Sequence, residues 1–389
     1  MTETTTGVSA FLDARPRIRP DLLFSRELHR GPARVYLVKI SGGRAFEVAA
    51  KEQFLMCRLD GQRTLSEIGD EYASRFGRRL GSQQWGEMLG LLHQRGLLEQ
   101  DDTPAPGALH PPPPFVRRLA AAFGWAFTAP AGFAAIIILI AMYAYLAAFW
   151  APLWRAAEPD LRDWRSLLGI VAIAYVSAAL HELAHGVAAI HFGCRTIRIS
   201  LIRLSCRVDD YLYLPVRSQQ VAVASVGGVV NSVIVAPFAL IWMVTPLSVP
   251  LHRFAAAVVV VCGIQSLINY VPTWPLDGYR VLSHLLDTIN LAEESHRYVW
   301  SRPRAWRSGQ PLAYPARARR VLGAYGVTWL VAALAACVAF QYVGTRLLRP
   351  ALGHVAGAVT AIILVLTISG WLTGRYRKAT RARTNNING

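Results

Sequence analysis

This sequence is poor in cysteine and in acidic residues. Its five cysteines are odd in number and form no C-x-x-C pair, which argues against a disulfide framework and against a zinc site made of thiolates. Its 24 acidic residues face 41 basic ones, giving a formal net charge of +17 at pH 7. The N-terminal region also lacks an apolar run long enough to cross a membrane, so we expect no cleaved signal peptide.

Long apolar runs are abundant farther along the chain. The chain is 53% hydrophobic, and a membrane-spanning helix needs about 20 mostly apolar residues. The sequence therefore predicts a mostly α-helical polytopic membrane protein with the lipid bilayer as a partner. We identify six candidate spans, at about 132–152, 166–192, 219–246, 254–273, 321–344 and 351–373.

The basic residues are distributed unevenly. Residues 1–105 hold 15 Lys and Arg against 14 Asp and Glu, whereas residues 106–389 hold 26 against 10. If the N-terminus is cytosolic, most of this excess falls in cytosolic segments between the spans, which is the positive-inside bias of membrane proteins. We therefore expect both termini to be cytosolic, and the charge indicates topology rather than a nucleic-acid partner.

The region before the first span has the pattern of a small soluble domain. Two short strand-like runs, 34–40 and 45–48, flank a Ser-Gly-Gly turn and predict a hairpin. Three helical patterns follow it. Thr64 and Glu67 have capping-box spacing, which predicts a helix start. The pattern is typical of an α+β winged-helix-like unit. The chain divides into a flexible tail (1–20), this domain (21–100), a semi-rigid proline-rich linker (101–116) and a membrane domain (117–389).

Two stretches of the soluble domain, 54–68 and 91–98, resemble the PqqD-like peptide-recognition domains. Such domains bind the leader of a ribosomally made peptide as an added strand, so that backbone hydrogen bonds supply the affinity. The resemblance implies a peptide partner. The alternative is a domain that only docks on the membrane half. Near-neutral charge argues against DNA binding.

The motif His181-Glu182-Leu183-Ala184-His185 carries the strongest chemical pattern. On a helix, residues four apart lie on one face, so both imidazoles can reach one Zn²⁺, and Glu182 lies beside it as a general base. The motif lies inside an apolar run, where such side chains are costly unless they are paired or bind a metal. We predict a zinc site. The alternative is a satisfied structural cluster.

Two residues compete to be the third ligand. His191 has the metzincin spacing, but Ala188 stands where that motif needs a glycine. On a continuous helix His191 would also point about 120° away from His185. Asp277 follows two prolines that should break the fourth span. The second and fourth spans cross in the same direction and bring both motifs to one side, so we predict Asp277, with a fourth position open for water.

These motifs resemble the site-2 proteases, a family of intramembrane zinc metalloproteases. The likeness is carried by the HExxH motif, Asn269-x-x-Pro272 and Leu276-Asp277-Gly278. Gly227-Gly228-Val-Val-Asn231 stands where the family has G-P-x-x-N. The resemblance implies that Asn231 and Asn269 orient the substrate or stabilise the oxyanion. For Asn231 the alternative is a helix-packing role.

The pattern of residues 195–208 is compatible with two structures. They alternate imperfectly between apolar and polar positions, which fits either a strand or hairpin beside the site or an ordinary basic loop. Asp209 and Asp210, which follow, are expected to be solvated or paired with the nearby arginines rather than bound to metal.

The segment after Leu276 resembles the peptide zinc metalloprotease branch linked to bacterial peptide biosynthesis. The predicted function is thus a zinc endopeptidase of a bacterial plasma membrane, with its site near the cytosolic side. We expect it to mature a ribosomally synthesised peptide that its N-terminal domain captures. One alternative is cleavage of a transmembrane signalling protein. Another is a non-catalytic peptide-binding or export accessory with structural zinc, which would have no need of Glu182.

Overall fold

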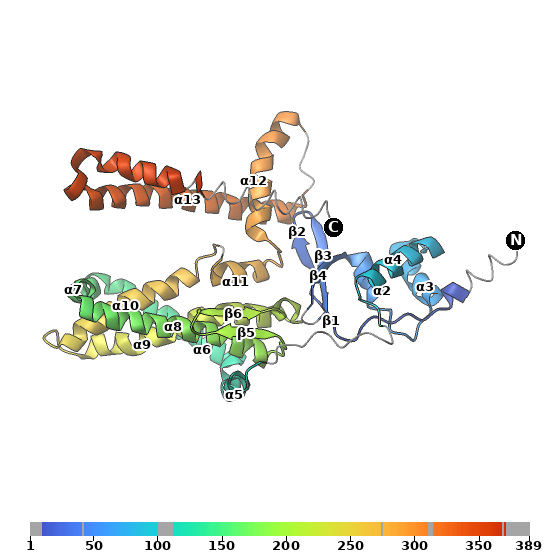
Figure 1. Cartoon of the computed structure of the whole chain (residues 1–389), viewed down its shortest axis with the longest axis horizontal. Helices are drawn as coiled ribbons and strands as arrows, with labels where there is room; N and C mark the ends of the chain where they lie inside the picture. Colours follow the sequence, from blue (N-terminus) through green and yellow to red (C-terminus); the bar gives the residue numbers. More distant parts are fainter. Residues whose placement is uncertain are drawn as a thin grey trace. The chain divides into compact units, whose positions relative to one another are not determined.

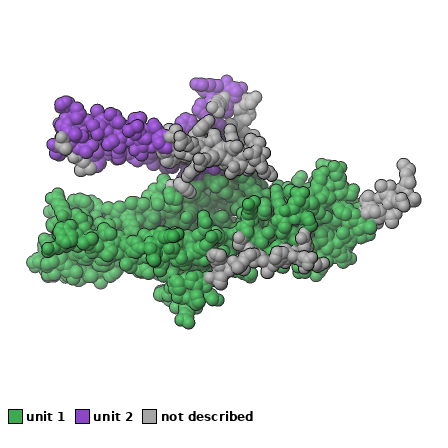
Figure 2. All heavy atoms as spheres, viewed as in Figure 1, with its two compact units in different colours: residues 1–291 green, residues 292–389 purple. Residues whose placement is uncertain are grey.

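The computed structural model describes residues 10–40, 43–99, 112–273, 275–309, 314–367 and 369–370. The chain forms two compact units, residues 1–291 and 292–389 (Figure 2). Helices dominate both units, and every strand of the described residues lies in the first (Figure 1). Most of the predicted linker, and the basic tail beyond residue 370, lie outside the described residues.

The first unit begins with a small antiparallel sheet. Its central strand is β3 (Ala33–Ile40), and β4 (Ala45–Ala49) pairs along one side of it. β1 (Leu22–Phe24) and β2 (Leu28–Arg30) pair with successive parts of the other side. The pairing of β3 with β4 confirms the hairpin expected from the Ser-Gly-Gly turn.

Three helices follow the sheet and share a core with it: α2 (Ala50–Met56), α3 (Leu65–Phe76) and α4 (Ser82–Gln94). At the start of α3, the Glu67 N–H donates to Thr64 Oγ1 at 3.2 Å, and the Thr64 N–H donates to Glu67 Oε2 at 2.8 Å. The predicted capping box is therefore formed. The shared core is apolar and fully buried, and includes Val38, Leu59, Leu65, Ile68, Trp85 and Leu97.

Residues 10–20 are not a free tail, contrary to the expectation for residues 1–20. Phe11 and Leu12 pack against the core of the domain. The Ile18 N–H donates to the Leu59 carbonyl at 2.9 Å, and the Arg19 N–H donates to the Leu97 carbonyl at 3.0 Å. These contacts join the segment to two loops distant in sequence, which local patterning does not encode. Residues 1–9 lie outside the described residues.

In the described part of the chain, five helices are long and apolar enough to cross a membrane, and they match the first five predicted spans. Together they indicate a membrane protein. The sixth predicted span, 351–373, runs beyond the described residues, and its described part holds a shorter apolar helix, Gly353–Thr367. The five are α6 (Ala129–Ala148), α8 (Trp164–His191), α9 (Arg217–Val244), α10 (Pro250–Asn269) and α13 (Ala316–Leu352).

Helix α10 is the central helix of the first unit. Its residues 255–260 are all buried, and α7, α8 and α9 pack around it. α7 follows α6 as a separate helix, which the search for apolar runs did not predict. The remaining helices are α5 (Pro114–Ala122), α7 (Trp150–Arg162), α11 (Asp277–Leu285), α12 (Leu291–Ser308), η1 (Gly124–Phe127), η2 (Tyr211–Tyr213) and η3 (Gly353–Val355).

Residues 197–208 form a hairpin rather than a loop, which decides between the two expectations for this segment. β5 (Ile197–Ser200) pairs antiparallel with β6 (Ser205–Val208). The hairpin lies along α8 (Figure 1). A Cβ on Gly186 would lie 2.4 Å from Ile199 Cδ1, so the Ile199 side chain packs directly on the glycine and would have to shift for any larger residue. Near the hairpin tip, the Tyr175 hydroxyl donates to the Ile202 carbonyl at 2.9 Å.

Candidate metal centre

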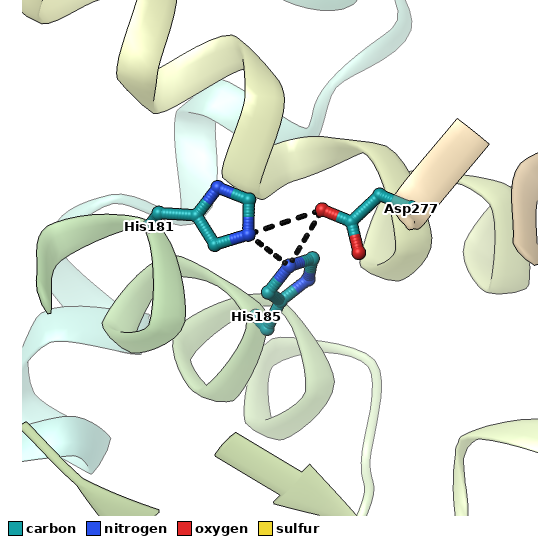
Figure 3. Close-up of side chains that lie close together, drawn as sticks. All are labelled: His181, His185 and Asp277. Atoms are coloured by element: carbon teal, nitrogen blue, oxygen red, sulfur yellow. Dashed lines mark hydrogen bonds and ion pairs between the residues drawn. The ribbon is translucent and has the colours of Figure 1, made fainter. Parts of the chain in front are cut away.

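Two helices bring the predicted ligands together. α8 carries His181 and His185 on one face, and α11 begins at Asp277 after the chain leaves α10 at Asn269. Figure 3 shows the two rings and the carboxylate pointing toward one another. Both His Nε2 atoms lie 3.1 Å from Asp277 Oδ2 and 3.2 Å from each other. All three residues are buried.

The size of this triangle suits one small metal ion. Zinc binds imidazole nitrogen and carboxylate oxygen at about 2.0–2.1 Å, so two ligands of a tetrahedral site lie roughly 3.3 Å apart. The three separations of 3.1, 3.1 and 3.2 Å are close to that value. His181, His185 and Asp277 could therefore hold a metal ion together.

The other nitrogen of each ring has a partner on α9. His185 Nδ1 lies 2.6 Å from the Val223 carbonyl, which can only accept, so Nδ1 carries the hydrogen and the neutral ring has its lone pair on Nε2. His181 Nδ1 lies 3.2 Å from the Asn231 amide, whose oxygen lies 3.1 Å from the Ser177 hydroxyl. An amide offers a donor and an acceptor, and a hydroxyl plays either role. The Asn231 atom that faces His181 is the amide nitrogen, a donor, and the Ser177 hydroxyl donates to the amide oxygen. With the amide turned by about 180°, its oxygen would accept from Nδ1–H and leave the Nε2 lone pair of His181 free.

Electron-rich atoms therefore converge in a buried place. The Nε2 atoms of His181 and His185 and the Oδ2 atom of Asp277 all face the same point. Arg280 lies 3.5 Å from the other Asp277 oxygen, but its side chain is half exposed. Only a proton or a cation at that point makes the arrangement favourable, and two imidazoles with one carboxylate are ligands that zinc accepts.

Gly227 leaves space for both rings. A Cβ at this position would lie 2.5 Å from His181 Cε1 and 2.5 Å from His185 Nε2, closer than any real contact. Val223, Gly227 and Asn231 recur every four residues, so they lie on one face of α9. That face thus provides a carbonyl for one ring, room for both and an amide for the other.

Glu182 is held by the hairpin. The Cys206 N–H, on β6, donates to Glu182 Oε2 at 2.6 Å. Sequence reasoning left the hairpin open and missed this contact. Burial, with the nearby charge of Glu182, raises the pKa of the Cys206 thiol to about 12. The thiol therefore stays protonated at neutral pH and is a poor metal ligand.

A cavity of about 430 Å³ adjoins the cluster. His181 and Glu182 line it from α8, Asn231 from α9 and Asn269 from α10. Asn269 therefore lies where the expected contact with a substrate would be made. Asn231 lies against the His181 ring, 3.2 Å from its Nδ1. The remaining lining residues are Ala178, Val261, Ile264, Gln265 and Ile268.

His191, the alternative third ligand, lies outside the cluster. Its ring stacks on Phe127, with 4.8 Å between the ring centroids, and the residue is exposed at the end of α8. The helix continues through His191, so the ring points elsewhere, as the absence of a glycine at Ala188 predicted.

A second buried ionic cluster joins the N-terminal domain to the segments that carry the site. Lys39 Nζ, on β3, lies 3.1 Å from Asp210 Oδ1, and both side chains are at least 90% buried. Asp209 pairs with Arg198 at 3.3 Å, in agreement with the expected pairing with a nearby arginine. Asp210 was expected to be solvated or paired with a nearby arginine, and it is instead buried. The partner is a lysine 171 residues away, which local spacing cannot indicate.

A backbone contact reinforces this junction. The His29 N–H, on β2, donates to the Asp287 carbonyl at 2.6 Å, and the Ile289 N–H donates to the His29 carbonyl at 2.9 Å. The Asp287 carboxylate also pairs with Arg26 and with Arg217. Asp287 lies just beyond α11, which begins at Asp277. The N-terminal domain is thus attached next to both the hairpin and the ligand-bearing helix.

Comparison with protein families, with curated proteins and with solved structures gives no match to this chain.

Proposed function

We propose that this chain is an intramembrane zinc endopeptidase of the kind that its motifs resemble, the site-2 proteases. One observation carries the proposal. The Nε2 atoms of His181 and His185 converge on Asp277 Oδ2, and all three residues are buried. The Nδ1–H of His185 donates to the Val223 carbonyl, which leaves its Nε2 free. Glu182 and a cavity lie directly beside this point, which a structural metal site would not require.

The chemistry follows from the residues around that point. Zinc held by His181, His185 and Asp277 would lower the pKa of a water and polarise a carbonyl. Glu182 is the general base: it accepts the water proton and passes it to the leaving amine. Asn231 positions His181, and Asn269 faces the substrate from the cavity wall.

We further propose that the substrate is a ribosomally synthesised peptide whose leader the N-terminal domain captures. β4 pairs with β3 along one side, and no strand among the described residues pairs with its other side. An extended peptide can add to such an edge through backbone hydrogen bonds. The junction at Lys39 and Asp210 would hold the captured peptide close to the hairpin that contacts Glu182.

The proposed setting is a bacterial plasma membrane crossed six times, with cytosolic termini and the site near the cytosolic side. The last six residues of α8 follow His185, a rise of about 9 Å. Asp277 comes shortly after the C-terminal end of α10. Both ligand segments therefore lie near the ends of helices that run in the same direction in the proposed topology.

A cleavage assay on a precursor peptide encoded beside this gene tests the proposal. The purified wild type should cleave the precursor, and Glu182→Gln should reduce the rate by about 10²–10⁴-fold, because a general base contributes that much. Glu158→Gln is the matched control, since Glu158 pairs with Arg162 on the surface of α7. Full activity of Glu182→Gln would refute the mechanism.

A further inference from the structure

Gln265 is a polar residue of the cavity wall that the proposed chemistry leaves unused. It lies on α10, one turn before Asn269, and both line the cavity beside Glu182. Its Nε2 donates to the Ala174 carbonyl at 3.4 Å, and its Oε1 is buried with no hydrogen-bond partner in the described residues. An amide oxygen without a donor is costly in apolar surroundings. Among the described residues, the fold thus supplies no donor for this oxygen.

The identity of the unpaired atom follows from its neighbour. The Ala174 carbonyl can accept but not donate, so the amide nitrogen of Gln265 must face it. The amide oxygen is therefore the atom without a partner among the described residues. A hydrogen bond of 3.4 Å is long for an N–H donor and an oxygen acceptor, hence weak. The amide can therefore turn toward a ligand at little cost and offer it both an acceptor and a donor.

The spacing of Gln265 and Asn269 matches an extended peptide. Four residues along a helix rise about 6.0 Å. In an extended chain, backbone groups on the same side recur every two residues, about 6.4–6.8 Å apart. Two amides one helical turn apart can therefore bond successive groups along one side of a peptide backbone. The wall around them is apolar, through Val261, Ile264 and Ile268.

We infer that Gln265 and Asn269 together bind the backbone of an extended peptide segment with apolar side chains, along α10 and opposite Glu182. Gln265 thereby becomes a substrate-binding residue of the cavity. The inference rests on the proposed peptidase function and adds to it the conformation and the polarity of the segment that is cleaved.

Hydroxamates test the inference without a turnover assay. The full chain, zinc-loaded in lipid nanodiscs, is titrated calorimetrically with a peptidyl hydroxamate that carries two backbone amides and apolar side chains. Acetohydroxamic acid, which has the metal-binding group but no peptide, is the second probe. Gln265→Leu keeps the approximate size of the side chain and removes the amide. Gln341→Leu, the same change on α13, is the matched control, because that amide bonds the Gly357 carbonyl instead.

We expect Gln265→Leu to weaken the peptidyl hydroxamate about tenfold, the effect of losing one or two hydrogen bonds, and to leave acetohydroxamic acid unchanged. Gln341→Leu should change neither. Equal affinity of wild type and Gln265→Leu for the peptidyl probe would overturn the inference alone. Equal weakening of both probes would also overturn it, since that indicates a structural role. If the wild type binds neither probe, the peptidase proposal itself fails, and this inference with it.

Discussion

Two of the buried polar clusters in the first unit are built differently. Lys39 and Asp210 pair one positive with one negative charge at 3.1 Å, so their junction is balanced by the chain itself. His181, His185 and Asp277 bring two imidazoles and a carboxylate to one point, and the nearby Arg280 is half exposed. Buried charges are ordinarily paired or coordinate a metal. The first cluster is a pair of opposite charges. The second is favourable only when a proton or a metal ion lies among its three ligand atoms, and the residues fit a metal ion.

The difference separates a structural role from a chemical one. Lys39 links the N-terminal sheet to residues just after the hairpin, and nothing in that pair points into the cavity beside the candidate metal centre. His181, in contrast, lines that cavity with Glu182. Breaking the first cluster should thus cost stability, and altering the second should cost metal binding.

Removing the lysine gives the largest expected effect. Lys39→Met leaves Asp210 buried without a counter-charge, which typically costs about 3–5 kcal/mol of unfolding free energy. Urea denaturation of the full chain in micelles, followed by tryptophan fluorescence, measures the change.

The double variant Lys39→Met/Asp210→Leu is the control for this prediction. It removes both charges and should recover most of the loss, because a buried ion pair replaced by apolar residues is often near neutral. A loss as large in the double variant as in the single one would mean that the pair does not stabilise the junction through its charges.

Filling the space beside the two histidines should have a smaller effect, and the quantity that changes is zinc affinity rather than stability. Gly227→Ala places a Cβ 2.5 Å from both rings. The rings must move, so zinc affinity should fall by about 10–100-fold, as when a group that orients a ligand is lost. Competition with a fluorescent zinc chelator measures it.

Gly263→Ala on α10 is the matched control, because a Cβ there meets nothing within 4 Å. It should leave zinc affinity unchanged and stabilise the helix by roughly 0.5–1 kcal/mol. Zinc affinity lowered equally by both changes would show that the space beside His181 and His185 is not what matters.

Much of the site follows from local spacing. Two histidines four residues apart must share a helix face, and the prolines that follow Asn269 end α10 and let a new helix begin at Asp277. The spans follow as directly, because length and apolar composition are local properties. The capping box of Thr64 and the β3–β4 hairpin were likewise predictable, because each is formed by residues close together in the sequence.

Apart from α7, which is too polar to appear in a search for apolar runs, the missed features depend on contacts between distant segments. The partner of Asp210 is Lys39, and the partner of Glu182 is the backbone of Cys206. The contacts of residues 10–20 are likewise made with remote loops. Asn231 could be placed near the site from its motif, but its position against a histidine ring depends on how α8 and α9 pack.

The zinc content of three forms of the full chain tests the central claim most directly. Wild type, His185→Gln and His191→Gln are purified, exposed to equimolar zinc, desalted and measured by atomic emission. A site of two histidines and one aspartate predicts about one zinc per chain in the wild type and in His191→Gln, and nearly none in His185→Gln. Equal zinc in His185→Gln and the wild type, or none in the wild type, would contradict the account.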